Sequence, residues 1–159
     1  MPAPAFEAKI CEPAEFAARA RRIARPMVFT NGVFDILHRG HVTYLAQARA
    51  LGSSLAVALN SDASVRRLGK GADRPVNALA DRMAVVAALE SVSLVTWFEE
   101  DTPLARILEG RPEHLVKGGD WSVERIVGAD EVKGWGGEVH SIAFRHEAST
   151  TRLLERIRR

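Results

Sequence analysis

The sequence contains one cysteine, Cys11, among its 159 residues. A lone thiol cannot form an internal disulfide, so the chain is not a disulfide-stapled secreted domain. It also lacks any apolar run near the ~20 residues that a membrane-spanning helix requires. The stretch from Met1 to Phe6 has no basic segment followed by an apolar core, unlike a secretory signal. These absences predict a cytoplasmic protein with no membrane partner.

A strong charge of either sign is absent as well. The formal net charge is +2, which predicts no uniformly basic face and argues against nucleic acid as the partner. Hydrophobic residues make up 47% and charged residues 26%, as in a globular protein with a substantial core. Because most single domains have roughly 100–200 residues, we expect one domain over residues 1–159. Residues 1–12 show little pattern and are interpreted as an N-terminal arm.

Short apolar segments alternate with segments of helical periodicity along the rest of the chain. This alternation predicts an α/β fold, a Rossmann-like parallel sheet of about five strands with helices on both faces. In such sheets, ligands bind beyond the carboxyl ends of the strands. Gly52 is expected to cap the second helix, and Thr102-Pro103 the helix that runs to Glu109. The expected strands are 27–30, 55–59, 94–98, 114–117 and 138–142, and the expected helices are 13–25, 41–50, 81–89, 103–109 and a terminal helix that begins at Ser149.

The segment from Thr30 to His41 places a glycine turn between a strand and a helix. His38 and His41, at positions i and i+3, should share one face of the helix start. A helix N-terminus offers unpaired N–H groups to a phosphate, and Gly40 allows close approach. The alternative is a capped helix with two surface histidines and Asp35 serving the turn. A zinc site needs a third ligand, and no cysteine or further histidine stands nearby in sequence, so no metal ligands are predicted.

The run Asn31-Gly32-Val33-Phe34-Asp35, followed by His38-Arg39-Gly40-His41, resembles the HxGH signature of the nucleotidyltransferase superfamily, in its cytidylyltransferase-like branch. Two positions depart from the pattern: Trp121 stands where many relatives have tyrosine, and Arg145 lies one residue out of step with a family arginine, so its role is left open. Other segments that match in the expected order are Asn60-Ser61-Asp62, the Lys70 loop, Arg74-Pro75-Val76-Asn77, Asp81-Arg82, Glu100-Asp101-Thr102-Pro103, Lys117-Gly118-Gly119-Asp120-Trp121 and Ser149-Thr150-Thr151.

The resemblance implies transfer of AMP from ATP to a heptose 1-phosphate, of D-glycero-β-D-manno configuration, with release of pyrophosphate. The product would be ADP-heptose for the inner core of lipopolysaccharide. The attacking phosphate is already an anion, so positioned cations and donors, rather than a general base, should supply most of the catalysis. The resemblance also implies a homo-oligomer, and Mg²⁺ held mainly by the ATP phosphates.

Site roles follow from the resemblance by position. His38, His41 and Lys70 are the expected catalytic residues. The expected nucleotide-binding residues are His38 and His41 again, with Asn31, Gly32, Val33, Phe34, Gly40, Lys117, Gly118, Asp120, Trp121, Ser149, Thr150 and Thr151. The expected substrate-binding residues are Asp35, Lys70, Arg74 and Asp101.

Structural roles compete with several of these assignments. Phe34 and Trp121 are also suited to packing, Ser149 to capping a helix, and Thr102 to capping or to a sugar contact. At the level of function, the alternatives are a cytidylyltransferase for a polyol or sugar phosphate such as glycerol 3-phosphate, a non-catalytic nucleotide-binding module, and a nucleic-acid-binding α/β domain. A non-catalytic module would be expected to lack His38, His41 or Lys70, yet all three are present.

Overall fold

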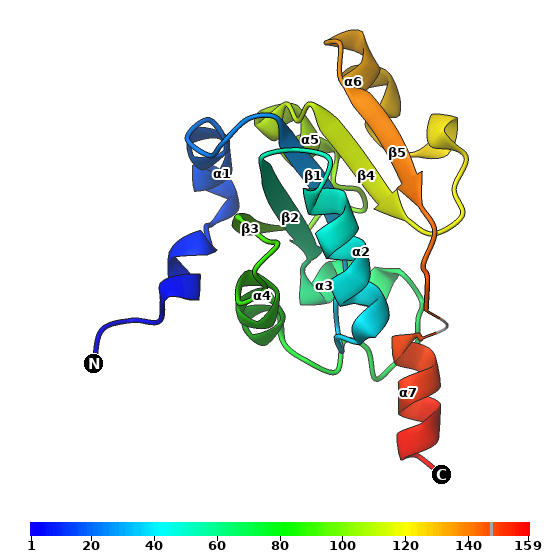
Figure 1. Cartoon of the computed structure of the whole chain (residues 1–159). Helices are drawn as coiled ribbons and strands as arrows, with labels where there is room; N and C mark the ends of the chain where they lie inside the picture. The colour runs from blue at the N-terminus through cyan, green and yellow to red at the C-terminus, as the bar shows by residue number, and fades with distance from the viewer. Residues whose placement is uncertain (147) are drawn as a thin grey trace.

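A computed structural model describes residues 1–146 and 148–159. Five parallel strands form one sheet in the order β3-β2-β1-β4-β5, with helices on both faces, which confirms the predicted α/β architecture (Figure 1). The elements are η1 Ala5–Lys9, α1 Pro13–Ala20, β1 Met27–Gly32, α2 Arg39–Arg49, β2 Ser54–Asn60, α3 Asp62–Arg67, α4 Leu79–Ala87, β3 Leu94–Phe98, α5 Leu104–Gly110, β4 His114–Gly118, η2 Val123–Arg125, α6 Ala129–Gly134, β5 Glu138–Ile142 and α7 Thr150–Ile157.

Both faces of the sheet are covered because side chains alternate along each strand. In β1, Phe29 packs with residues of α1, α5 and α6. Its neighbour Val28 points to the other face and packs with residues of α2 and α4. β2 is buried along its whole length, as expected for a strand near the centre of a parallel sheet.

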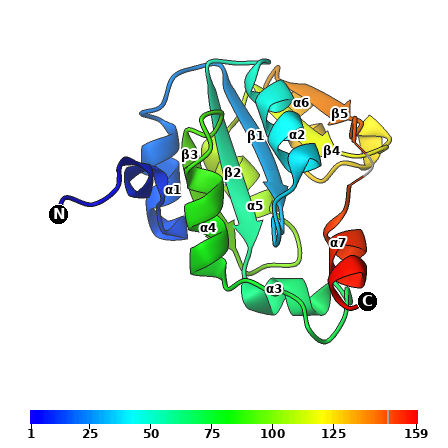
Figure 2. The ribbon, with the colours of Figure 1, turned by 60° about the horizontal axis from the view of Figure 1, so that its bottom comes forward.

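The carboxyl ends of the strands meet at one edge of the sheet. In Figure 2, β1 and β2 point toward α3 and α7, which lie beyond this edge. β1 is central, and the chain leaves it to build β2 and β3 on one side and β4 and β5 on the other. This reversal creates a crevice between the ends of β1 and β4, the usual ligand site of such sheets.

One predicted helix cap is wrong, and a second is confirmed only at Pro103. The helix predicted to close at Gly52 ends at Arg49, with Ala50 as its cap. Gly52 has a different purpose, because a Cβ there would lie 2.6 Å from the carbonyl oxygen of Pro26. α5 is capped by Pro103 without a side-chain hydrogen bond, and Thr102 is exposed.

Several element boundaries also differ from prediction. α1 ends at Ala20, five residues before the predicted end. α2 begins two residues early, at Arg39, because the His38 side chain caps it. α6 was not expected from its short polar sequence, and α3 begins at Asp62, the last residue of the Asn60-Ser61-Asp62 motif.

The N-terminal arm is bound to the rest of the fold. Ile10 pairs with Val95 of β3, and the Lys9 ammonium donates a hydrogen bond of 3.1 Å to the carbonyl oxygen of Leu89. Cys11 follows and is buried in the core. None of the helices in the described part of the chain has both the length and the apolarity of a membrane span.

Candidate active site

A trench of three adjoining cavities follows the carboxyl-terminal edge of the sheet. The first has a volume of about 380 Å³, and the other two have volumes of about 150 and 130 Å³. Val33, Phe34, His41 and Phe144 line both the first and the second cavity. Asn31 and Lys117 line both the second and the third. The remaining lining residues of the first cavity are Asp35, His38, Lys70, Arg74, Ala148, Ser149, Thr150 and Thr151.

The turn after β1 directs the two histidines to one spot. Phe34 takes a left-handed conformation (φ 49°), which is costly for an aromatic residue and turns the chain sharply. The Nδ1 atom of His38 then accepts a hydrogen bond of 3.1 Å from the Gly40 amide and caps α2. A Cβ on Gly40 would lie 2.9 Å from the His38 ring, so a side chain here would displace the imidazole that caps the helix.

His41 is held between two aromatic rings. It stacks on His38 with ring centroids 3.9 Å apart, and Phe34 meets it edge-on at 5.4 Å. Burial, followed by repulsion from His38 and Lys70, lowers the pKa of His41 to about 4. The imidazole is therefore neutral at pH 7. Its Nδ1 atom is buried and has no hydrogen-bond partner among the described residues.

Two cations from the loop between α3 and α4 face these histidines. Lys70 and Arg74 both line the first cavity. Partial desolvation, and then repulsion from Arg74, lowers the pKa of the Lys70 ammonium, although much of the side chain still faces solvent; Asp35 opposes the shift. An anion in the cavity would relieve this repulsion between cations.

Asp35 fixes the position of Arg74. Its carboxylate accepts hydrogen bonds from the Arg74 Nε atom at 2.7 Å and from the amides of Val76 and Asn77 at 2.9 Å. Burial alone would raise the pKa of the Asp35 carboxyl, but these donors outweigh it and the pKa lies below its ordinary value. Both carboxylate oxygens are thus engaged by the protein.

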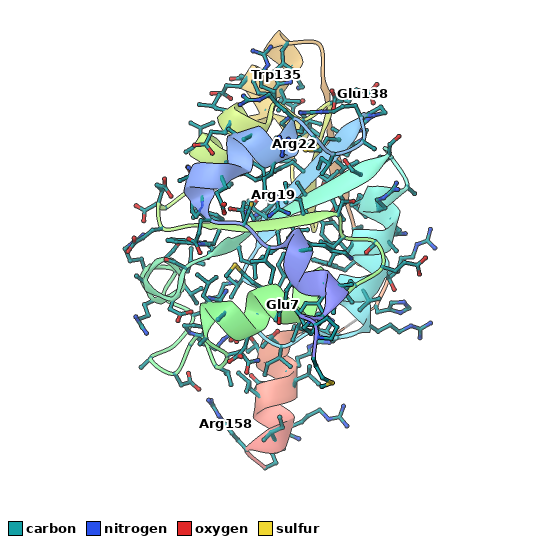
Figure 3. The ribbon with its side chains drawn as sticks, turned by 90° about the vertical axis from the view of Figure 1, so that its left-hand side faces the viewer. Glu7, Arg19, Arg22, Trp135, Glu138 and Arg158 are labelled. Atoms are coloured by element: carbon teal, nitrogen blue, oxygen red, sulfur yellow. The ribbon has the colours of Figure 1, made fainter. Side chains whose placement is uncertain are left out.

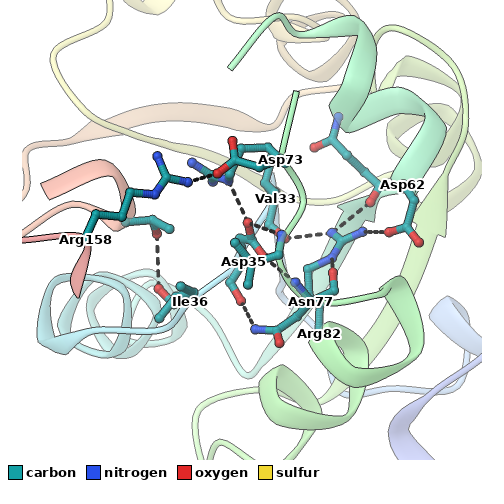
Figure 4. Close-up of polar contacts among 12 residues, drawn as sticks. Val33, Asp35, Ile36, Asp62, Asp73, Asn77, Arg82 and Arg158 are labelled. Carbon is teal, nitrogen blue, oxygen red and sulfur yellow. Dashed lines mark hydrogen bonds and ion pairs between the residues drawn. The ribbon is translucent and has the colours of Figure 1, made fainter. Parts of the chain in front are cut away.

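Arg82 ties together the loops beneath the trench, a role not assigned from the sequence (Figure 4). Its buried guanidinium donates hydrogen bonds of 2.9–3.0 Å to the carbonyl oxygens of Val33, Asn60 and Asn77. It also forms an ion pair of 2.6 Å with Asp62. One side chain therefore joins the ends of β1 and β2 to the start of α4.

The start of α7 forms another wall of the first cavity. Ser149 caps this helix by accepting a hydrogen bond of 3.1 Å from the Arg152 amide. The Thr150 hydroxyl donates to the carbonyl oxygen of Ile36 at 3.1 Å, which joins α7 to the turn after β1. At the other end of α7, Arg158 pairs with Asp73 of the Lys70 loop (Figure 4).

The end of β4 forms the far part of the trench. The Trp121 indole N–H donates to the carbonyl oxygen of Gly118 at 3.2 Å, and the residue remains 51% exposed. The Lys117 ammonium lies 5.9 Å from the centre of that ring. Burial, and then repulsion from Lys70, lowers the pKa of Lys117. This end of the trench offers an open aromatic surface beside a cation.

The structure does not bring every predicted site residue into the trench. Asp101 forms an exposed ion pair of 2.8 Å with Arg67 and lines none of the three cavities. Asp120 is exposed and likewise lines none of them. Arg145 is exposed next to Phe144. Phe144 itself lines two cavities and was not predicted, because an isolated phenylalanine carries no sequence signal for a ligand site.

Comparisons with known proteins agree with this geometry. The family model described as cytidylyltransferase-like matches residues 29–156. A D-beta-D-heptose 1-phosphate adenylyltransferase of Bordetella bronchiseptica is 57% identical over 155 residues, which cover 96% of each chain. The bifunctional protein HldE of Hahella chejuensis is 57% identical over 141 residues, covering 88% of this chain and 29% of that protein.

Among solved structures, a lipopolysaccharide core biosynthesis protein of Thermoplasma volcanium is similar, with a TM-score of 0.61 and 26% identity. The match covers 77% of this chain and 98% of that one.

Proposed function

The chain belongs to the cytidylyltransferase-like family, and on that premise we propose that it transfers AMP from ATP to D-glycero-β-D-manno-heptose 1-phosphate, giving ADP-heptose and pyrophosphate. The relative with this activity in its name matches nearly the whole chain. The observation that carries the proposal is the cavity where the stacked His38 and His41 meet Lys70 and Arg74 at a helix N-terminus. Such a cavity suits a polyphosphate.

In the proposed reaction, a phosphate oxygen of the sugar phosphate attacks the α-phosphorus of ATP. The bond from that phosphorus to the β-phosphate oxygen breaks, and pyrophosphate leaves. No proton has to be removed from the attacking anion. His38, His41 and Lys70 then stabilise the charge that develops on the phosphates. The neutral His41 donates one N–H, and the triphosphate beside it raises its pKa toward protonation.

We place the triphosphate in the first cavity and the nucleoside along the second and third. The amides at the start of α7 would then serve the terminal phosphates, with Ser149, Thr150 and Thr151 beside them. The ribose and base would extend past Gly118 toward the exposed face of Trp121. Asn31, Gly32 and Lys117 line the path between the two ends.

Asp35 and Arg74 support the acceptor end of the site in this arrangement. Arg74 faces the cavity while Asp35 holds it in place. Asp101 remains a proposed contact of the acceptor and Asp120 of the nucleotide, although neither lines the trench. The alternative substrates, CTP and glycerol 3-phosphate, differ in the base and the acceptor and leave the phosphate chemistry the same.

Mg²⁺ would enter with the triphosphate. Asp35 is the one carboxylate among the described residues that line the first cavity, and both its oxygens are engaged. The protein therefore offers the ion few ligands, and the phosphates and water would hold it, as Mg²⁺ commonly prefers. We further propose a cytoplasmic homo-oligomer.

The test is pyrophosphate release by the purified protein with Mg²⁺, comparing ATP with CTP, each with and without the heptose 1-phosphate. Release with ATP that depends on the sugar phosphate is expected, and a His41→Gln variant serves as the control for contaminating activity. Release with CTP, or with glycerol 3-phosphate as acceptor, would move the assignment to the cytidylyltransferase alternative. Nucleotide binding without release for any pair would indicate a non-catalytic module.

A further inference from the structure

A second group of converging side chains lies at the opposite edge of the sheet. His114 is the first residue of β4, and Glu138 is the first residue of β5. The two residues are paired in register, so their side chains share one face of the sheet. His140, two residues after Glu138, projects from the same face. Three potential metal ligands are therefore adjacent although 23 residues lie between His114 and Glu138 in the sequence.

The distances between the three ligand atoms are close to those between neighbouring ligands of one metal ion. The Nδ1 atom of His114 lies 3.1 Å from the Nε2 atom of His140. The Oε2 atom of Glu138 lies 3.5 Å from the same Nε2 atom and 3.9 Å from the Nδ1 atom of His114. Zinc bonds of 2.0–2.2 Å in a tetrahedron place neighbouring ligand atoms about 3.4 Å apart. One ion fits against all three atoms after shifts of a few tenths of an ångström.

The surroundings of the group suit an ion that enters from solvent. The side chains of His114 and His140 are 17% and 26% exposed, so the imidazoles are held in place by their neighbours. Glu138 is 69% exposed and can adjust its carboxylate to complete the set. No other group of three such ligands is found among residues 1–146 and 148–159.

This group is separate from the trench. The trench follows the carboxyl ends of the strands, whereas His114 and Glu138 begin theirs. Figure 3 shows Glu138 at one end of the molecule and Arg158, from the helix that walls the first cavity, at the other. An ion here would take no part in phosphoryl chemistry. It would join the edge strand β5 to β4.

We propose that His114, Glu138 and His140 form a binding site for a divalent transition metal of the zinc class, with water as the fourth ligand. Two imidazoles and one carboxylate are typical ligands for Zn²⁺, Co²⁺ or Ni²⁺. Mg²⁺ and Ca²⁺ prefer oxygen ligands and should be rejected. The ion's role is to fasten the edge of the sheet.

The test is titration of the metal-free protein with Zn²⁺ by calorimetry, together with zinc-edge anomalous diffraction from crystals grown with the ion. One ion per chain is expected at the three residues. His140→Gln or His114→Gln should weaken binding by more than the roughly 10–100-fold that is lost when a residue hydrogen-bonded to a metal ligand is replaced. Mg²⁺ should give neither heat nor displacement of Zn²⁺.

Matched controls separate this site from the other histidines of the chain. The double variant His38→Gln/His41→Gln should retain the site, as should His146→Gln. Undiminished Zn²⁺ affinity in His140→Gln, or anomalous density at His38 and His41 alone, would overturn the proposal. If the histidine variants fail to fold, Glu138→Gln, on an exposed side chain, and the wild-type anomalous map still decide it. The result does not depend on which substrates the trench accepts.

Discussion

The buried pair of Asp35 and Arg74 should contribute strongly to stability, and Asp35→Asn tests this. The side chains are 0% and 6% exposed, and the ion-pair distance is 2.7 Å. Replacing the carboxylate by an amide leaves the guanidinium buried without its counter-charge. It also turns an NH2 group toward donors that previously met an oxygen.

The expected loss can be estimated from similar cases. Removing one partner of a buried ion pair commonly costs about 3–5 kcal/mol, because the other charge remains desolvated. Taking the lower value, a chain of this size should melt about 6–12 °C lower. Loss of the Arg74 position should also reduce turnover, since that side chain lines the first cavity.

The chain supplies a matched control in Asp101→Asn. Asp101 pairs with Arg67 through the same Nε geometry at 2.8 Å, but the two side chains are 82% and 48% exposed. An exposed pair of this kind contributes less than about 1 kcal/mol. The same variant reports on the predicted substrate contact, because an unchanged acceptor KM would remove Asp101 from the site.

The pH dependence provides an independent check. The pKa of Asp35 is lower in the folded protein than its ordinary value of about 3.9. Its contribution is therefore fully present above about pH 4 and is lost as the pH falls through the folded pKa. Urea unfolding of wild type and Asp35→Asn should differ most at neutral pH and converge in acid. A difference at pH 7 no larger than that of Asp101→Asn would refute this account.

Three further predictions concern two residues that we propose to face the phosphates, His41 and Lys70. His41→Gln should lower kcat by roughly 10²–10³-fold, as for loss of one transition-state donor, while circular dichroism stays unchanged; near-normal turnover would remove His41 from the mechanism. Lys70→Met should lower kcat more than it raises the Kd for ATP, and equal effects on both would make Lys70 a binding residue only. The pKa of His41 is about 4 in the folded protein against an ordinary 6.5, so below pH 6.5 the unfolded chain takes up a proton that the folded protein does not. The resulting loss of unfolding free energy is absent above pH 6.5 and grows to about 3 kcal/mol by pH 4. His41→Gln should flatten the loss of unfolding free energy across that window, and parallel curves for the two proteins would contradict the shifted pKa.

The centre of the sheet could be predicted closely because its inner strands contain continuous apolar runs. β2 is buried at all seven of its residues, and β3 matches its predicted bounds. Helix ends were less accurate, since they depend on which side chain caps them. His38 caps α2. Gly52 is needed because a side chain there would collide with the carbonyl oxygen of Pro26, which lies in another segment.

The candidate site was predictable where a local motif carries it and not where distant segments meet. The HxGH turn, the Lys70 loop and the start of α7 line one cavity, as their order along the chain suggested. Arg82 lies on an amphipathic helix, where an arginine normally faces solvent, and its burial depends on carbonyl groups of three other segments. The meeting of His114 with His140 depends on strand register, which periodicity alone does not determine.

Arg82 holds the loops under the trench, and it is a different residue from those that line the trench and could select substrates. Val33, Asn60 and Asn77 are held by a guanidinium that lies beneath the cavities and lines none of them. Residues that we propose to face the base, such as Trp121, can therefore be exchanged without loosening the loops that line the proposed phosphate site. A fold arranged in this way can acquire new nucleotide or acceptor preferences by mutation while it keeps the same phosphate chemistry. Position 82, by contrast, should tolerate almost no substitution in any variant that keeps its catalytic activity.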